Sequence, residues 1–117
     1  MLEKTNRVNI LFDFYGQLLK DRQKQFLEMY YRDDLTLSEI AELMDVSRQA
    51  VFDQLKRTEN VLENYEEKLQ LLAKHQEREE RLSHLLQIVE SEQWDQDQIR
   101  SEIKELVQFE LEQSEEA

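Results

Sequence analysis

The chain has no cysteine and no proline, and its one glycine is Gly16. The lack of cysteine excludes disulfide bonds and thiolate metal sites, which suits a cytoplasmic protein. No apolar run approaches the roughly 18 residues that a membrane span requires, and the first residues enter an amphipathic stretch that is unlike an export signal. We therefore expect a cytoplasmic protein that neither crosses a membrane nor is exported.

Charge and helix-forming residues take the place of what is missing. Of 117 residues, 36% are charged, and Glu, Gln, Leu and Lys dominate, a composition that predicts an all-α fold. Residues 1–58 hold nine Lys and Arg against ten Asp and Glu, whereas residues 59–117 hold six against 17. The net charges are therefore −1 and −11, so the C-terminal half would repel a phosphate backbone, and a basic contact face is expected only in the N-terminal half.

Residues 36–58 are the most informative segment, because they predict two short helices around a tight turn. Thr36 and Glu39 have the spacing of a capping box at the first helix, and Ser47 can cap the second. Asp45 occupies the turn, where a left-handed backbone is often needed. A small core between the helices is expected from Ile40, Ala41, Leu43, Met44, Val46, Val51 and Leu55. This pattern is typical of a helix-turn-helix, whose second helix usually enters a DNA major groove.

Two further helices are predicted before this segment, capped by Thr5 and by Asp21. Their apolar residues recur every three or four positions: Val8, Leu11, Phe12, Tyr15, Leu18 and Leu19 in the first, and Phe26, Leu27 and Tyr30 in the second. With the helix-turn-helix pair they make a four-helix domain, which we assign to residues 1–62.

Residues 63–117 are expected to form an acidic helical arm that continues from the second helix of the motif. The apolar seam through Val51, Leu55, Thr58, Leu62, Tyr65, Leu69 and Leu72 is interrupted by the polar residues 74–81 and resumes at Leu82. One long helix between 47 and 90, or two helices broken near residue 75, would both fit this pattern.

A turn over residues 91–97 precedes a last helix, with Asp95 as its cap. Trp94 in this turn can be a core plug or an anchor for a partner, and we expect packing. The arm has a narrow apolar stripe that must be covered by the first domain, by its own hairpin partner or by a second chain. We expect a homodimer formed through this arm.

If the motif binds duplex DNA, the outward residues of the second helix carry the contacts. The DNA-binding candidates are Ser47, Arg48, Gln49, Phe52, Asp53, Lys56 and Arg57. Arg48 can pair bidentately with guanine and Gln49 with adenine, while Lys56 and Arg57 suit phosphates. Further phosphate contacts can come from Lys20, Arg22 and Lys24 at the start of the preceding helix.

Two of these residues also suit a different ligand. Phe52 can touch a thymine methyl group, but an exposed aromatic ring serves a protein partner equally well. Asp53 opposes phosphate and can accept a hydrogen bond only from cytosine N4. A helix-turn-helix scaffold used for protein contact therefore stays open beside nucleic-acid binding.

Catalysis is not supported by any motif. His75 and His84 are nine residues apart, so they do not share a helix face as i, i+4 metal ligands do, and we expect them to be solvated. A Gly-rich phosphate loop, a Ser/His/Asp arrangement and a Cys motif are all missing. We expect a protein that is not an enzyme and binds no metal or cofactor.

Family resemblance adds to this interpretation. Residues 19–62, above all 21–23, 37–43 and 46–51, are similar to the promoter-reading fourth region of bacterial sigma factors. Segments 5–15, 30–34, 47–53, 56–59 and 66–69 resemble more closely the YlxM family of small bacterial helix-turn-helix proteins. The sigma similarity implies DNA contacts at Arg48, Gln49, Phe52, Asp53 and Lys56.

The YlxM resemblance implies a role in the signal recognition particle pathway, since that family is encoded beside the particle's GTPase genes. Our leading hypothesis is a DNA-binding regulator linked to that pathway. The alternative is an adaptor that contacts the particle's protein or RNA through the same helix or the acidic arm. A third hypothesis is a packing scaffold with no nucleic-acid ligand.

Overall fold

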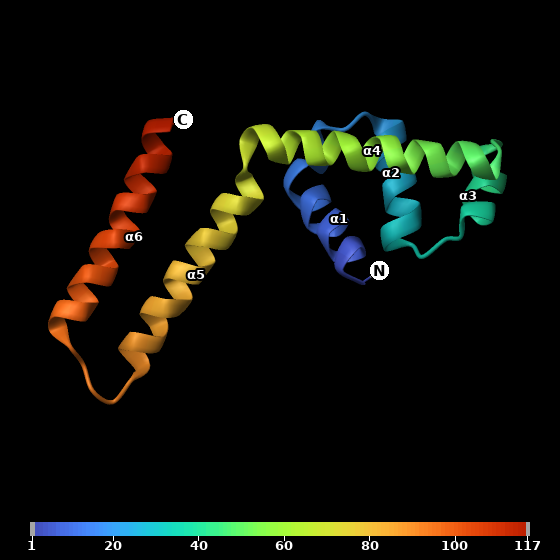
Figure 1. Cartoon of the computed structure of the whole chain (residues 1–117). Helices are drawn as coiled ribbons and strands as arrows, with labels where there is room; N and C mark the ends of the chain where they lie inside the picture. Colours follow the sequence, from blue (N-terminus) through green and yellow to red (C-terminus); the bar gives the residue numbers. More distant parts are fainter. Residues whose placement is uncertain (1, 117) are drawn as a thin grey trace. The chain divides into compact units, whose positions relative to one another are not determined.

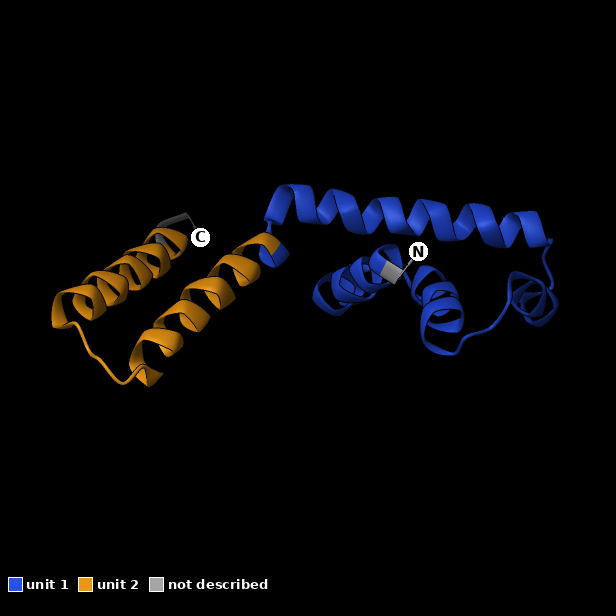
Figure 2. Ribbon diagram, turned by 60° about the horizontal axis from the view of Figure 1, so that its bottom comes forward, with its two compact units in different colours: residues 1–72 blue, residues 73–117 orange. Residues whose placement is uncertain are grey.

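The computed structural model describes residues 2–116, and these residues are helical with no strand, which confirms the all-α prediction (Figure 1). The elements are α1 (Leu2–Tyr15), the 3-10 turn η1 (Gly16–Leu18), α2 (Asp21–Leu27), the π-helical turn η2 (Glu28–Arg32), α3 (Leu37–Met44), α4 (Arg48–Leu69), α5 (Leu71–Glu90) and α6 (Gln96–Glu116). They form two compact units, residues 1–72 and 73–117 (Figure 2). The boundary that we assigned after residue 62 falls inside α4.

In the first unit, α4 is the element on which the others assemble. Helices α1, α2 and α3 all pack against it and lie along one side of it (Figure 1). The core that they share includes Leu11, Tyr15, Phe26, Leu27, Ile40, Val51, Leu55 and Leu62, each at most 3% exposed. One long side of α4 is thereby buried, and the opposite side faces solvent.

Three residues that we expected in this core are exposed, and the first is Tyr30, 37% exposed, which lies in η2 beyond the end of α2. Leu18, 54% exposed, lies in η1, where the tighter 3-10 geometry ends the 3.6-residue period that placed it on the core side. Leu43, 65% exposed, lies off the buried face of α3, which is formed by Ile40 and Ala41. These errors come from extending a helical period beyond the end of a helix, for Leu18 and Tyr30, or too widely around a short helix, for Leu43.

The predicted caps of the first two helices are also wrong. Helix α1 already begins at Leu2, so Thr5 lies inside it. The cap position of α2 is Lys20, whose N–H donates to the Gln23 side chain at 3.1 Å, and Asp21 is the first residue of the helix.

The end of α4 settles the choice between one helix and two. Gln70 adopts a left-handed conformation (φ 55°, ψ 32°), which ends α4 at Leu69, and α5 begins at Leu71. Two helices are present, but residue 75, where the two-helix alternative placed the break, is inside α5. The polar run at 74–81 therefore does not interrupt the helix, and two of its residues, Arg78 and Arg81, contact α6.

A buried hydrogen-bond network holds this break in place. Glu66, 8% exposed, accepts hydrogen bonds at Oε1 from the Tyr15 hydroxyl (2.6 Å) and from the backbone N–H of Leu72 (2.9 Å). The Tyr15 oxygen in turn accepts from the backbone N–H of Leu71 at 3.0 Å. The first backbone donors of α5 are thus satisfied by side chains of α1 and α4.

The second unit is an antiparallel hairpin of α5 and α6 (Figure 2). Arg78 pairs with Glu110, and His84 lies 3.0 Å from Glu102. The Arg81 guanidinium stacks over the buried Phe109 ring, 5.0 Å from its centroid. The turn before α6 is capped as predicted, because the Asp95 carboxylate accepts from the N–H groups of residues 97 and 98.

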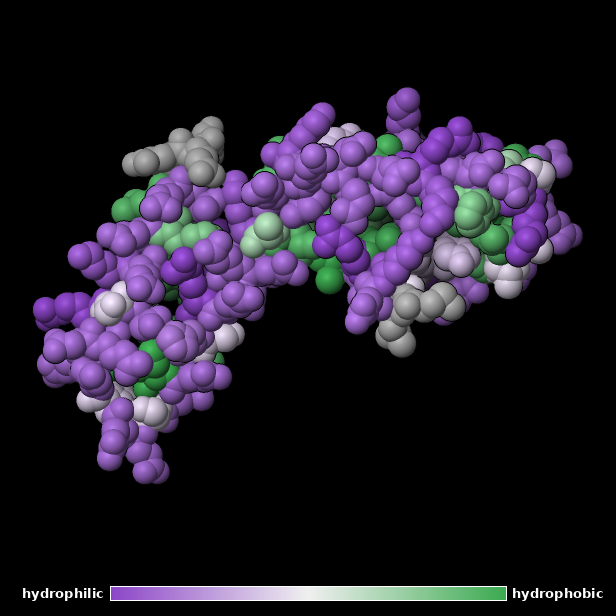
Figure 3. Space-filling model, in the orientation of Figure 1, coloured by the Kyte–Doolittle hydropathy of each residue, from purple (hydrophilic) through white to green (hydrophobic). Residues whose placement is uncertain are grey.

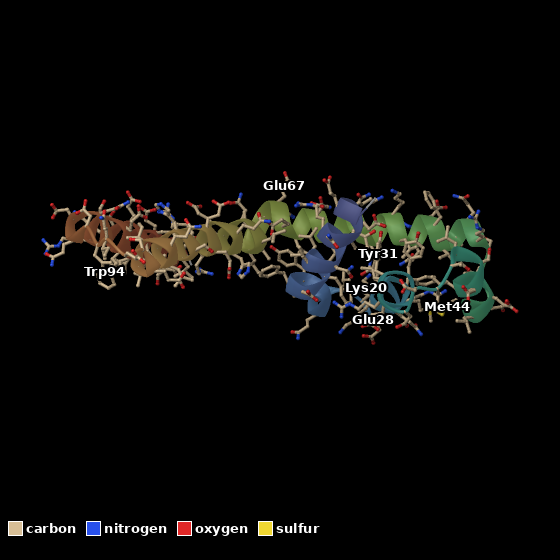
Figure 4. The ribbon with its side chains drawn as sticks, turned by 90° about the horizontal axis from the view of Figure 1, so that it is seen from below. Lys20, Glu28, Tyr31, Met44, Glu67 and Trp94 are labelled. Carbon is tan, nitrogen blue, oxygen red and sulfur yellow. The ribbon has the colours of Figure 1, made fainter. Side chains whose placement is uncertain are left out.

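Trp94 corrects another prediction. It is 63% exposed, so it is not a core plug (Figure 4). Its place in the turn, outside the seam between the two helices, accounts for this exposure.

Candidate nucleic-acid interface

The first helix of the motif begins with the predicted capping box. The N–H of Glu39 donates to the Thr36 hydroxyl oxygen at 3.1 Å, and the N–H of Thr36 donates to the Glu39 carboxylate at 3.0 Å. At the other end, Asp45 adopts the predicted left-handed conformation (φ 55°, ψ 48°). Val46 N–H then donates to the Ala41 carbonyl at 3.0 Å, which closes the turn between the two helices.

The second helix of the motif starts from an equally defined cap. The Ser47 hydroxyl accepts from the backbone N–H of Ala50 at 3.0 Å, as predicted. Ile40 and Val51 are fully buried between α3 and α4, and Ala41, 9% exposed, lets the two helices approach closely. Capping and packing together fix the first turns of α4 while its outer side faces solvent.

The outer side of α4 carries the predicted contact residues, all of them exposed: Ser47, Arg48, Gln49, Phe52, Asp53, Lys56 and Arg57. Four of these side chains contact one another in two pairs along the helix. Gln49 Nε2 donates to the Asp53 carboxylate at 3.0 Å, so Gln49 must leave this bond before it can pair with adenine. Lys56 lies over the Phe52 ring, 5.6 Å from its centroid, and Phe52 is itself 43% exposed.

Helix α1 supplies a basic residue that the sequence analysis missed. Lys4 lies 3.5 Å from Glu59 and beside Lys56, and the nearby Lys4 ammonium lowers the pKa of Lys56. Two ammonium groups of separate helices thus lie on one flank of α4, where the Glu59 carboxylate offsets part of their repulsion. Only the packing of α1 against α4 reveals this pair, because 52 positions separate the two lysines in the sequence.

Arg48 lies on the same flank, at an open hollow of about 480 Å³. Thr5, Tyr30 and Tyr31 also line this hollow. The Tyr31 hydroxyl donates to Glu59 at 3.1 Å, and burial raises the pKa of Tyr31. Arg48 therefore borders a recess with aromatic walls, a setting that its position in the sequence did not indicate.

The second predicted basic group is separate from this surface. Lys20, Arg22 and Lys24 belong to the start of α2, and Arg22 stacks over Phe26 at 5.3 Å. Figure 4 shows Lys20 away from the ribbon of α4. Among the described residues no recorded contact joins these three side chains to the outer side of α4.

Two other chemistries find no support in the described part of the chain. Residues 2–116 contain no cluster of three His, Cys, Asp or Glu side chains that could hold a metal ion. No helix among them has the length and apolar character needed to cross a membrane.

The capped, tightly crossed pair α3–α4 defines a helix-turn-helix protein. The chain belongs to the family described as "Putative helix-turn-helix protein, YlxM / p13 like" (UPF0122), whose model matches residues 2–107. It is 52% identical over 108 residues to UPF0122 proteins of Bacillus cereus, Bacillus anthracis and Bacillus thuringiensis. Each match covers 92% of this chain and 94% of the relative. The family resemblance drawn from the sequence is thereby confirmed.

Proposed function

We propose that this protein binds duplex DNA through the N-terminal half of α4 and acts as a regulatory protein. The observation that carries the proposal is that α4 begins at a fixed cap and presents every predicted contact residue to solvent. A recognition helix needs both properties, because its first turns must reach base edges without rearrangement of the fold.

The proposed contacts divide into base-reading and phosphate-binding groups. Arg48 reads guanine, and Gln49 reads adenine after it releases Asp53. Lys56 and Arg57 bind phosphates, and Lys4 joins them from α1. Because the whole chain carries a net charge of −12, we expect moderate affinity that depends strongly on these few cations.

Titration with duplexes at two salt concentrations tests this proposal. Affinity should fall steeply between about 50 and 200 mM salt, since each neutralised phosphate releases counterions. Lys56→Ala should weaken binding to all sequences alike and reduce the salt slope by about one, whereas Arg48→Ala should relax preference at one base pair. Lys68→Ala, which removes an exposed cation from the last turn of α4, is the matched control. Sequence preference that Arg48→Ala leaves unchanged would show that Arg48 does not read a base.

A second function is favoured by Phe52. An aromatic ring that is 43% exposed on the contact helix, with Asp53 beside it, suits a protein surface better than a phosphate backbone. The resemblance to YlxM proteins points to the signal recognition particle as the partner, through its protein or its RNA. In this case Phe52→Ala should abolish binding to the particle while Arg48→Ala leaves it intact. Purified particle protein and particle RNA, titrated separately, distinguish the two ligands.

A further inference from the structure

The second unit has an apolar face that its own hairpin does not cover. In the part of α5 that belongs to this unit the exposed large apolar residues are Leu82, Leu86 and Val89, and on α6 they are Ile103, Val107 and Leu111. These six side chains are 39–60% exposed, and the more exposed Trp94 lines a hollow with Ile99 and Ile103 at the turn end. The side of the hairpin visible in Figure 3 is, by contrast, largely hydrophilic.

Both apolar stripes face the same side of the hairpin. In α5 the residues turned toward α6 include Arg78, Arg81 and Leu85. Around the helix axis, the apolar stripe of α5 is rotated from these residues by about a quarter turn, in the sense in which the chain winds. In α6 the stripe follows the inward residues, such as Leu106 and Phe109, in the same sense. Because the two helices run antiparallel, equal rotations bring both stripes to one side.

Charged residues are distributed around this face in a way that suits a second copy of the chain. Residues 73–117 hold five Lys and Arg against 13 Asp and Glu, yet helical spacing puts Glu77, Glu80, Glu105 and Glu112 on the opposite side. The edges of the apolar face differ in sign. The α5 edge carries Glu79 and Glu90, and the α6 edge carries Arg100 and Lys104.

From these observations we infer that two hairpins pair through this face and form a four-helix bundle. A two-fold axis parallel to the helices puts α5 of one copy over α6 of the other, so the acidic edge of each copy meets the basic edge of its partner. The seven exposed apolar side chains offer on the order of 600 Å² per copy, close to the ~800 Å² per partner of a standard interface. This surface is at the upper end of the largest apolar patches that monomers expose, and such patches often mark an interaction site.

The first test is the oligomeric state of the full chain, measured by sedimentation equilibrium over a wide range of concentration. We expect a reversible dimer whose dissociation constant rises about tenfold or more in Leu86→Glu, because each dimer then buries two charges. Gln87→Glu, which adds the same charge at the neighbouring residue on the other side, should leave the constant unchanged. Emission of Trp94, the one tryptophan, should shift to the blue on association in the wild type.

Charge reversal tests the arrangement. Arg100→Glu with Lys104→Glu should weaken self-association, and so should Glu79→Lys with Glu90→Lys, whereas a mixture of the two double variants should regain wild-type affinity. A chain that stays monomeric at all concentrations would overturn the inference and assign the face to another partner. A dimer unaffected by Leu86→Glu, or by either double variant, would overturn it equally. Far-UV circular dichroism of each variant establishes that the helices are intact.

Discussion

The break between α4 and α5 offers the sharpest test of the structure, because one buried carboxylate holds it. Glu66→Leu keeps a side chain of similar volume but removes the acceptor for the Tyr15 hydroxyl and the Leu72 N–H. Glu66→Gln keeps an acceptor oxygen at the same place and is the matched control. Tyr15→Phe removes the network from its other side, where the hydroxyl accepts from Leu71.

The expected magnitudes follow from the burial of the network. A buried donor left without an acceptor costs about 1–3 kcal/mol, and Glu66→Leu creates two of them. Relief of desolvating the carboxylate offsets part of that cost, so we expect Glu66→Leu to lower the free energy of unfolding by about 2–4 kcal/mol. Glu66→Gln and Tyr15→Phe should each cost about 1–2 kcal/mol. The double variant Tyr15→Phe/Glu66→Leu should cost less than the sum of the two single variants, since the Tyr15 hydroxyl and the Glu66 carboxylate are hydrogen-bonded to each other.

Urea unfolding with two optical probes measures these changes. Far-UV circular dichroism follows all helices, whereas Trp94 is the one tryptophan and follows the second unit. The loss in Glu66→Leu should therefore appear in the circular dichroism transition, together with faster hydrogen exchange at the Leu72 amide. A change in unfolding free energy below about 0.5 kcal/mol for Glu66→Leu, or additive effects in the double variant, would refute the claim that this network stabilises the break between α4 and α5.

Three further predictions concern stability. Ser47→Ala should lower the free energy of unfolding by about 1 kcal/mol, because the Ala50 N–H loses its cap, and Ser47→Asp should retain most of it; equal stability of both variants would contradict the capping role. Asp45→Gly should raise the free energy of unfolding by about 0.5 kcal/mol, because glycine adopts the left-handed conformation without strain. The thermal midpoint should rise with it, and a lower midpoint would count against this reasoning. Burial and the Glu66 hydrogen bond raise the pKa of Tyr15 from 10.0 to about 12, so its contribution is complete below pH 10 and is lost as the pH rises toward 12. Unfolding midpoints measured across this range should fall less steeply in Tyr15→Phe than in the wild type, and parallel curves would exclude Tyr15 as the titrating group.

The helix-turn-helix was predictable because its determinants are local. The capping box of Thr36 and Glu39 joins residues three positions apart, and so does the Ser47 cap. Asp45 is one of the few residue types that tolerate the left-handed turn, so its conformation followed from its identity. Exposure of the contact residues on α4 followed from helical spacing alone, since the positions of the buried residues Val51 and Leu55 define the opposite side.

Tertiary structure decided the features that depend on distant residues. Glutamine has no marked preference for the left-handed region, and Gln70 ends α4 where Glu66 and Tyr15, 51 positions apart, can satisfy the first donors of α5. The meeting of Lys4 with Lys56 likewise exists only because α1 packs against α4. The amino-acid sequence by itself therefore determined the all-α class, the helix-turn-helix motif and the exposed side of α4, since hydrogen bonds and periodicity act over a few positions. Where α4 ends and which cations flank it depend on contacts between helices far apart in the chain, which only the folded structure brings together.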